Sequence, residues 1–544
     1  MSGKKKRCGA EPAGRHSDHK ISGKRGTDVG KEKNLYEIWW ERASEGERRE
    51  AFDFSEDYVN FLNTCKTERE VTAWTIERLR SLGFRDLREY LTAAGAGGTA
   101  AALRPGDKVY SDVRGKSVLA AVIGQEPAWR GVNIIASHID SPRLDFKQTP
   151  LYEDTHLALA KTHYYGGIKK YQWVCLPLAL RGVVALKDGR LTEINIGDRE
   201  GDPCFVITDI LPHLAQQQMS KKMSEAITGE GLNVLLASLP RTDAGAAAQT
   251  SPASAGKQSG AKAKSAAAGT GAATGASGAN ANQEKNEESE KVKANLLRIL
   301  KESYGIEEKD FVSAEIEVVP ALPARDVGFD RGLVGGYGQD DRVCSFAGLR
   351  ALLDLGATPA KTALLYFSDK EEVGSQGNTG AQSAALGNFI AELCGATAEG
   401  YSDLMVRRCF TASALLSADV GTAVDPTYKD LQDPLNANYL GKGLILEKYT
   451  GSRGKSGGND ANPEFIAALR QILDEAKVAW QTGELGKVDL GGGGTVAMYM
   501  ANMGMQVIDC GTPVLSMHAP FEITSKGDIY NTYLGYRAFL RHYK

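Results

Sequence analysis

Five short motifs place histidine or acidic side chains where predicted strands end in this chain of 544 residues. They are His138-Ile139-Asp140, Gln339-Asp340-Asp341, Asp369-Lys370-Glu371-Glu372, Ala418-Asp419 and Met517-His518. Ligand-binding groups gather at the carboxyl ends of strands in α/β sheets. Imidazole and carboxylate ligands suit Zn²⁺, or Co²⁺ or Mn²⁺ in its place. Because no cysteine belongs to the set, the motifs favour a catalytic metal site with open coordination positions.

Each motif alone also has a structural explanation. A histidine that follows a strand is often simply buried and hydrogen-bonded, and acids such as Asp340 and Asp341 are common at the start of a helix. The acids at 369–372 would suit a surface loop, although a loop does not explain why they directly follow an apolar strand. Taken together, the motifs favour a metal site, in which one carboxylate beyond the ligands would act as general base on bound water.

Two neighbouring features bear on this site. Asp140 lies on the same side of an extended segment as His138, where a carboxylate can fix the tautomer of a metal-bound imidazole. The glycine run at 491–494 is followed by Thr495-Val496 and not by Lys-Ser/Thr, so it is not a phosphate-binding P-loop. It is either a tight turn whose backbone approaches the site or merely a turn.

The elements that must position these residues alternate between strands and helices. Predicted strands include 132–136, 362–368, 412–418, 488–490 and 506–511, and predicted helices include 346–355, 463–480 and a last one from Thr524. This alternation predicts a three-layer α/β sheet structure. Between its two halves, residues 143–240 are rich in predicted strands, such as 173–186 and 191–196.

Two segments are too polar to build a core. Residues 1–33 form a basic tail, and residues 240–291 contain no Leu, Ile, Val, Met, Phe, Tyr or Trp. We expect a disordered tail and a flexible low-complexity insert.

Composition limits the classes of function. The 65 basic and 68 acidic residues give a net charge of −3, which offers no whole-chain case for binding nucleic acid or an anionic membrane. No apolar run reaches the roughly 18 residues that a membrane span needs. The eight cysteines include no CxxC pair, and the N-terminal residues lack the apolar core of a secretory signal. We therefore expect a cytoplasmic protein that acts without membrane or nucleic acid.

Six longer stretches around the motifs occur in the order of one known enzyme family. They are SHIDSPRLDFK, GQDDRVCSFAGL, DKEEVGSQGNTGAQS, SADVGTAVDPTY, GGGGTVAMYMANMG and CGTPVLSMHAPFEI. In these stretches the chain resembles the aspartyl aminopeptidase family of dinuclear zinc enzymes, over most of residues 35–240 and 292–544. The resemblance implies a metalloaminopeptidase that removes N-terminal residues from peptides, with two Zn²⁺ per subunit and Co²⁺ or Mn²⁺ as substitutes.

The resemblance also assigns a role to each residue of the site. The implied metal ligands are His138, Asp340, Glu372, Asp419 and His518. Asp340 would bridge both metals, His138 and Asp419 would complete one, and Glu372 and His518 would complete the other. The implied catalytic residues are Glu371, which takes a proton from the bridging water, and Asp140, which orients His138.

The family fold implies a division of the chain. Residues 34–142 and 323–544 would form the three-layer α/β zinc-exopeptidase catalytic domain. Residues 143–322 would form an interrupting β-rich dimerisation domain that carries the insert. Since family members typically assemble into dodecamers, we expect a homo-oligomer, with a dodecamer as the family's usual size.

Departures from the family leave the preferred N-terminal residue open. His213 is kept, but Gln217 stands where the eukaryotic enzymes have a second histidine, and Asp425 replaces another histidine. The basic stretch Lys448–Gly458 could recognise an acidic side chain or be a solvated loop. Acidic, basic, apolar and broad preferences are all compatible with these residues.

Two other functions compete with the aminopeptidase hypothesis. A related dinuclear zinc enzyme could hydrolyse N-acyl amino acids, and a catalytically silent assembly protein could use the same fold. The presence of all implied ligands and of the base argues against the silent protein. A nucleic-acid binder that uses the basic tail is disfavoured because the rest of the chain has no matching basic stripe.

Overall fold

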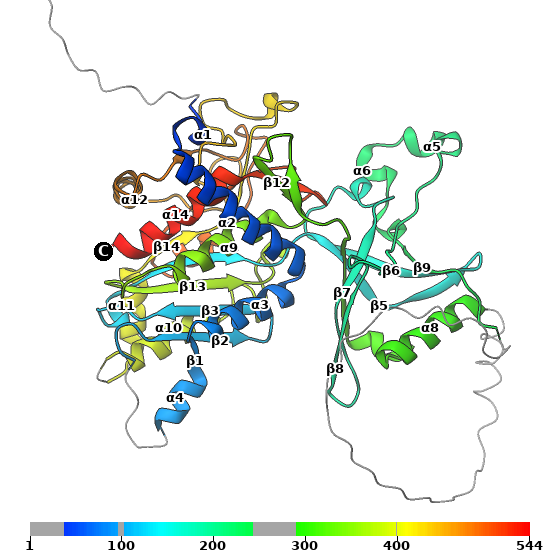
Figure 1. Cartoon of the computed structure of the whole chain (residues 1–544), viewed down its shortest axis with the longest axis horizontal. Helices are drawn as coiled ribbons and strands as arrows, with labels where there is room; N and C mark the ends of the chain where they lie inside the picture. The colour runs from blue at the N-terminus through cyan, green and yellow to red at the C-terminus, as the bar shows by residue number, and fades with distance from the viewer. Residues whose placement is uncertain (1–36, 96–102, 243–289, 399) are drawn as a thin grey trace, which may run out of the picture. The chain divides into compact units, whose positions relative to one another are not determined.

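The computed structural model describes residues 37–95, 103–242, 290–398 and 400–544 (Figure 1). The predicted basic tail at 1–33 lies outside these residues, as does all but the ends of the predicted insert at 240–291.

A seven-stranded sheet, in the order β1-β2-β3-β13-β4-β14-β18, carries the implied site. Its strands are β1 (Arg85–Asp86), β2 (Lys108–Val113), β3 (Ser117–Val122), β4 (Val132–His138), β13 (Thr362–Ser368), β14 (Ala414–Ser417) and β18 (Gln506–Asp509). Strands β13, β4, β14 and β18 are parallel, so their carboxyl ends meet at one edge. The register sets Ser368 beside His138, and Ser417 beside Asp509. This edge therefore gathers His138 and Asp509, which end β4 and β18, and the acids that follow β13 and β14.

Helices cover both faces of this sheet. In β13, Leu364 and Tyr366 join one buried apolar cluster, whereas Leu365 and Phe367 join another. The first cluster includes α10 (Ala385–Ala396) and α11 (Asp403–Ala412), and the second includes α2 (Glu45–Thr64), α3 (Glu68–Ser81), α9 (Gln339–Leu353), α12 (Pro463–Glu475) and α14 (Lys526–His542). A strand that is buried on both sides must be apolar throughout, as β13 is. The predicted three-layer α/β structure is confirmed.

Short helices and two small sheets complete this region. The helices are α1 (Trp39–Arg42), α4 (Leu87–Gly95) and α13 (Ala497–Ala501). A five-stranded sheet contains β11 (Arg325–Val327), β12 (Leu333–Gly336), β20 (Glu522–Ser525), β19 (Pro513–Leu515) and β15 (Gly421–Thr422). Strands β16 (Leu444–Leu446) and β17 (Trp480–Thr482) form a pair. The turn between β19 and β20 holds His518.

A six-stranded antiparallel sheet, in the order β8-β7-β10-β5-β6-β9, lies between Arg143 and Pro320. Its strands are β5 (Arg143–Asp154), β6 (Leu157–Tyr165), β7 (Leu178–Ala185), β8 (Leu191–Ile196), β9 (Val234–Ala237) and β10 (Ala314–Pro320). Helix α8 (Lys291–Tyr304) packs against it through Val292 and Leu296 (Figure 1). The short helices α5 (Gln216–Met219) and α6 (Met223–Ala226) precede β9. Residues Ile38–Lys544 form one compact unit, so the domain boundaries stay a prediction.

Two predicted elements differ in the structure. The strand expected at 488–490 is wrong, because these residues form an exposed turn. The helix expected to reach Trp480 ends at Glu475, since Lys477 adopts a left-handed φ of 57° that no helix can continue through. The chain then enters β17 at Trp480. The apolar residues just before this strand had suggested that the helix continues.

A buried ion-pair network joins the α2–α3 junction to the six-stranded sheet. The Nζ atom of Lys66 lies 2.8 Å from Oδ2 of Asp198 and donates to the Pro320 carbonyl at 2.7 Å. Arg181 contacts the same Asp198 oxygen at 2.6 Å and Glu70 at 2.5 Å. Lys66 is 3% exposed, so its charge depends on these partners.

We expect Lys66→Met to lower the free energy of unfolding by about 3 kcal/mol, because it leaves buried acceptors without their donor. Arg181 would still neutralise Asp198. The shift in the urea midpoint measures the effect, and Lys187→Met, at an exposed lysine, is the matched control. Equal midpoints for the two variants would contradict a structural role for the network.

Candidate metal centre

His138 ends β4 and is buried, with its two ring nitrogens directed to different partners. Nδ1 lies 3.0 Å from the backbone oxygen of Asp140 and 3.4 Å from its Oδ1. Nε2 faces Oδ1 of Asp340 at 3.1 Å and Oδ1 of Asp419 at 3.8 Å. Burial opposes a charge here, but hydrogen bonds to these three carboxylates raise the pKa of His138 well above its usual value. The surroundings of Nε2 therefore favour positive charge.

Asp340 stands between the two histidines. Its Oδ1 lies 3.1 Å from Nε2 of His138, and its Oδ2 lies 3.2 Å from Nε2 of His518. Burial would raise the pKa of Asp340, but the hydrogen bonds from both histidines hold it well below its ordinary range. Its backbone is held as well, because its N–H donates to Glu522 at 3.0 Å and its carbonyl accepts from Ser141 at 2.9 Å. One oxygen toward each histidine is the geometry that a carboxylate shared by two cations needs.

His518 lies in the β19–β20 turn and mirrors the arrangement of His138. Its Nδ1 donates to the Gly167 carbonyl at 2.9 Å, which leaves Nε2 directed at Asp340. The Nε2 atom also lies 3.7 Å from Oε1 of Glu372. In both histidines Nδ1 therefore meets an outer partner, and Nε2 faces the carboxylates, as expected for metal-binding imidazoles.

Glu371 and Glu372 begin the short 3₁₀ helix η6 (Glu371–Val373) just after β13. Their backbone N–H groups both donate to Asp140, at 3.1 and 3.2 Å. Burial, together with the Asp340 carboxylate, raises the pKa of Glu372 well above its usual value. Burial also raises the pKa of Glu371, to about 8. Nearby cations would reverse both effects and keep the two carboxylates ionised.

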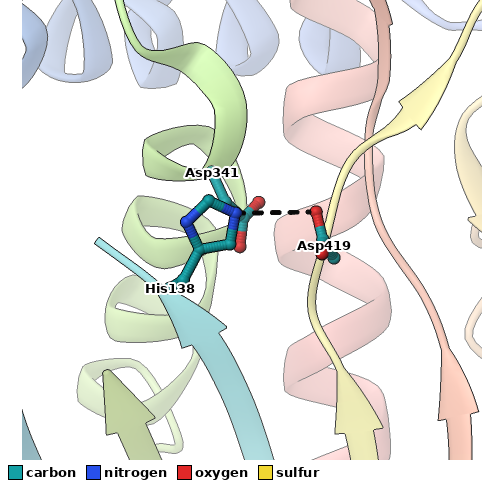
Figure 2. A group of neighbouring side chains, drawn as sticks. All are labelled: His138, Asp341 and Asp419. Atoms are coloured by element: carbon teal, nitrogen blue, oxygen red, sulfur yellow. Dashed lines mark ion pairs between the residues drawn. The ribbon is translucent and has the colours of Figure 1, made fainter. Parts of the chain in front are cut away.

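Asp341 is not among the implied ligands, yet the structure brings it to His138 and Asp419 (Figure 2). Potential ligand atoms of these three residues all lie within 4.8 Å of one another. Neither carboxylate oxygen of Asp341 has a hydrogen-bond partner among the described residues. Burial and the Asp419 charge raise the pKa of Asp341 well above its usual value. The signal in the sequence that could have indicated Asp341 as a site residue was its position directly after Asp340.

The donor set fits resident cations. A second group, formed by His138, Asp340 and Glu372, also has ligand atoms within 4.8 Å of one another. The buried Oε1 of Glu372 makes no hydrogen bond to any described residue. Buried carboxylates without partners are costly unless they are paired or bind metal. The structure thus gathers every predicted site residue at one place, with oxygen and nitrogen donors suited to zinc.

Asp509 is a further buried acid that sequence reasoning missed, because it lay inside the strand predicted at 506–511, whereas the observed strand β18 ends at this residue. It accepts hydrogen bonds from Thr495 at 2.6 Å and from Thr450 at 3.0 Å. Burial raises its pKa to about 6. It thereby ties the end of the glycine run, and the loop after β16, to the strand beside Asp419. A Cβ on Gly492 would lie 2.3 Å from the Gly451 carbonyl, so close approach of the two loops requires glycine there.

Four side chains from the segments considered for specificity are exposed, namely Lys448, Lys455, His213 and Gln217. Lys448 and Lys455 both contact the Asp460 carboxylate, the latter at 2.9 Å. His213 and Gln217 are exposed, in the short 3₁₀ helix Pro212–Leu214 and in α5. Two of the cations in the Lys448–Gly458 stretch are therefore already paired.

Within the described ranges, we find no helix that has both the length and the apolar character needed to cross a bilayer.

The family model described as aminopeptidase I zinc metalloprotease (M18) matches residues 61–254 and 264–540. This chain belongs to the M18 aminopeptidase family. It is 46% identical to the probable M18 family aminopeptidase 1 of Clostridium acetobutylicum, over 93% of this chain and 98% of that protein. It is 42% identical to the probable M18 family aminopeptidase 1 of Thermotoga maritima, over 92% of this chain and 98% of that protein.

Solved structures of M18 aminopeptidases share the fold. The Thermotoga maritima enzyme matches with a TM-score of 0.80 and 41% identity, covering 93% of this chain and 99% of that one. Aminopeptidase I from Clostridium acetobutylicum matches with a TM-score of 0.78 and 44% identity, over the same shares. The predicted family and the predicted aminopeptidase function are confirmed.

Proposed function

We propose that this M18 aminopeptidase is a zinc-dependent exopeptidase that removes N-terminal residues from peptides at the site built around Asp340. The observation that carries the proposal is that each Asp340 oxygen faces one histidine, at 3.1 and 3.2 Å. Two bound zinc ions, or Co²⁺ or Mn²⁺ in their place, would polarise the scissile carbonyl and lower the pKa of the attacking water. His138, Asp419 and Asp340 would hold one ion, and Asp340, Glu372 and His518 the other.

Glu371 would move the proton. Its backbone is fixed by Asp140, while its side chain is half-buried beside the ligands and is not assigned to a metal. A carboxylate in this position accepts a proton from water as the water attacks and returns it to the departing amine. Asp140 would serve the reaction indirectly, because it holds His138 and the backbone of Glu371 and Glu372.

We also propose that the chain self-associates into a homo-oligomer through the region at 143–322, and that it acts in the cytoplasm. Large apolar side chains are exposed between β8 and β9, namely Ile210, Leu211, Leu214, Met219 and Met223. A solved structure titled as the S. cerevesiae mApe1 dodecamer shares the fold, with 18% identity, a TM-score of 0.66 and coverage of 92% of this chain and 98% of that one. The seven described cysteines are all free, which suits a reducing compartment.

Chelation tests the proposed function. We expect removal of divalent ions to abolish hydrolysis of aminoacyl chromogenic substrates, and added Zn²⁺, Co²⁺ or Mn²⁺ to restore it. A panel of N-terminal residues, each with a free or an acylated amine, separates an aminopeptidase from an N-acyl amidohydrolase. Activity that survives exhaustive chelation, or cleavage of acylated substrates alone, would overturn the proposal.

A further inference from the structure

The segment Tyr165-Gly166-Gly167 reaches the metal centre from the end of β6, in the six-stranded sheet. The Tyr165 hydroxyl donates to Oδ2 of Asp140 at 2.8 Å. The Gly167 carbonyl accepts from Nδ1 of His518 at 2.9 Å. Gly166 has a φ of 72°, and a Cβ there would lie 3.2 Å from Glu372. Tyr165 and Gly167 thus contact Asp140 and His518, and Gly166 leaves room for Glu372; the proposed function uses all three of these partners.

Asp140 links this segment to Glu371 and His138, site residues that the segment does not touch itself. Its Oδ1 accepts the Glu371 N–H at 3.1 Å and lies 3.4 Å from Nδ1 of His138. Its Oδ2 accepts the Glu372 N–H at 3.2 Å and the Tyr165 hydroxyl at 2.8 Å. The orientation of this one carboxylate therefore bears on the backbone of Glu371 and of Glu372, and it supports the His138 ring together with the Asp140 carbonyl, which lies 3.0 Å from Nδ1. The hydroxyl of Tyr165 is the only one of these contacts that does not come from a residue of the proposed site.

The tyrosine ring is itself held firmly. The guanidinium of Arg143 lies 4.0 Å from its centroid, in a cation–π contact, and Arg143 pairs with Tyr165 across β5 and β6. Arg143 is buried and lies 3.0 Å from Glu317 and 3.5 Å from Glu68. Because Glu68 begins α3 and Glu317 lies in β10, this anchor joins the helix layer to the six-stranded sheet. The hydroxyl consequently has little freedom to follow Asp140 if that carboxylate turns.

We propose that Tyr165 is a positioning residue for the aminopeptidase reaction, supplied by the six-stranded sheet to lock Asp140 in the orientation that aligns Glu371 and His138. This inference rests on the proposed function. Hydrogen bonds to an ionised acceptor in a buried place are strong and directional. Without the hydroxyl, Oδ2 of Asp140 keeps only the Glu372 N–H, so the carboxylate can rotate and carry the start of η6 with it. Loss of such an outer partner typically costs about 10- to 100-fold in metal affinity or activity.

The test is Tyr165→Phe, which removes one oxygen and keeps the ring beneath Arg143. We expect kcat to fall by about 10- to 100-fold while KM changes little, because the lost hydroxyl acts through Asp140. The visible absorption bands of the Co²⁺-loaded protein should also change, since the ligand geometry around the ion is altered. The matched control is Tyr530→Phe, which removes a hydroxyl that donates to the Glu50 carboxylate in the α14–α2 contact. Melting temperatures of both variants report on folding.

The outcomes are distinct. Lower kcat and altered Co²⁺ bands in Tyr165→Phe, with both unchanged in Tyr530→Phe, support the positioning role. An active wild-type protein in which Tyr165→Phe keeps its kcat and its Co²⁺ spectrum overturns that role alone. A loss of activity that follows only a fall in melting temperature, with an unchanged Co²⁺ spectrum, also overturns it. A wild-type protein that binds no metal and hydrolyses no substrate overturns the proposed function and this inference together.

Discussion

Glu371→Gln is expected to lower kcat by about 10²- to 10⁴-fold while both metal ions stay bound. The amide has nearly the shape of the carboxylate, so the backbone contact of residue 371 with Asp140 and the ligand Glu372 should be preserved. What disappears is the oxygen that accepts a proton from water. Steady-state kinetics together with metal content measured by elemental analysis check the result.

Glu230→Gln provides the control for this variant. Glu230 is an exposed glutamate that pairs with Lys147 at 2.7 Å, in the six-stranded region. The same chemical change there should leave kcat within about 2-fold of the wild-type value, as surface substitutions usually do. Retention of most of the wild-type rate by Glu371→Gln would assign the base to another group. Loss of metal from that variant would instead place Glu371 among the ligands.

Asp340→Asn should weaken metal binding by more than about 100-fold, beyond the usual effect of changing an outer partner. The carboxylate offers one oxygen to each histidine, whereas an amide offers a single oxygen and no charge. Both ions should be affected, so the bound metal should fall below one per chain and hydrolysis should disappear with it. Titration with Zn²⁺ against a competing chelator measures the change.

Asp341→Asn is the informative comparison, because Asp341 shares burial and chain position with Asp340 but faces only His138 and Asp419. We expect it to weaken one ion at most. If Asp341→Asn removes both ions while Asp340→Asn retains them, the bridging role belongs to Asp341 and the assignment made from the motif is wrong. The two adjacent substitutions therefore decide which carboxylate is shared.

Residues at the end of a strand of the six-stranded sheet contact the proposed site directly. Gly167 and Tyr165 come from this sheet, yet they orient His518 and Asp140. The Lys66–Asp198 pair and the Arg143–Glu68 pair fasten the same sheet to the helices behind the catalytic strands. We therefore expect substitutions at this junction to alter turnover as well as stability.

Much of the site was predictable from the chain alone, because its signals are local. A histidine ends β4, and acids follow β13 and β14 within two residues; the parallel pairing of these three strands aligns their ends at one edge. The resemblance in the surrounding motifs was enough to name the family, which the comparisons confirm, whereas the ligand roles stay predictions. Strand limits were predicted closely where burial on both faces keeps the residues apolar, as in 362–368.

Other features depend on contacts between residues that lie far apart in the chain, and only the tertiary structure shows them. Tyr165 donates to a carboxylate 25 positions earlier, and no periodicity marks a tyrosine at the end of a strand as part of a metal centre. The exposed turn at 488–490 has the apolar residues of a strand, but no neighbouring strand pairs with it in the described structure. Side-chain type therefore predicted the chemistry of this protein. Contacts between segments far apart in the chain, such as Tyr165 with Asp140 and Gly167 with His518, decided which atoms face the site. Such contacts depend on where the fold brings distant backbone together and not on local sequence.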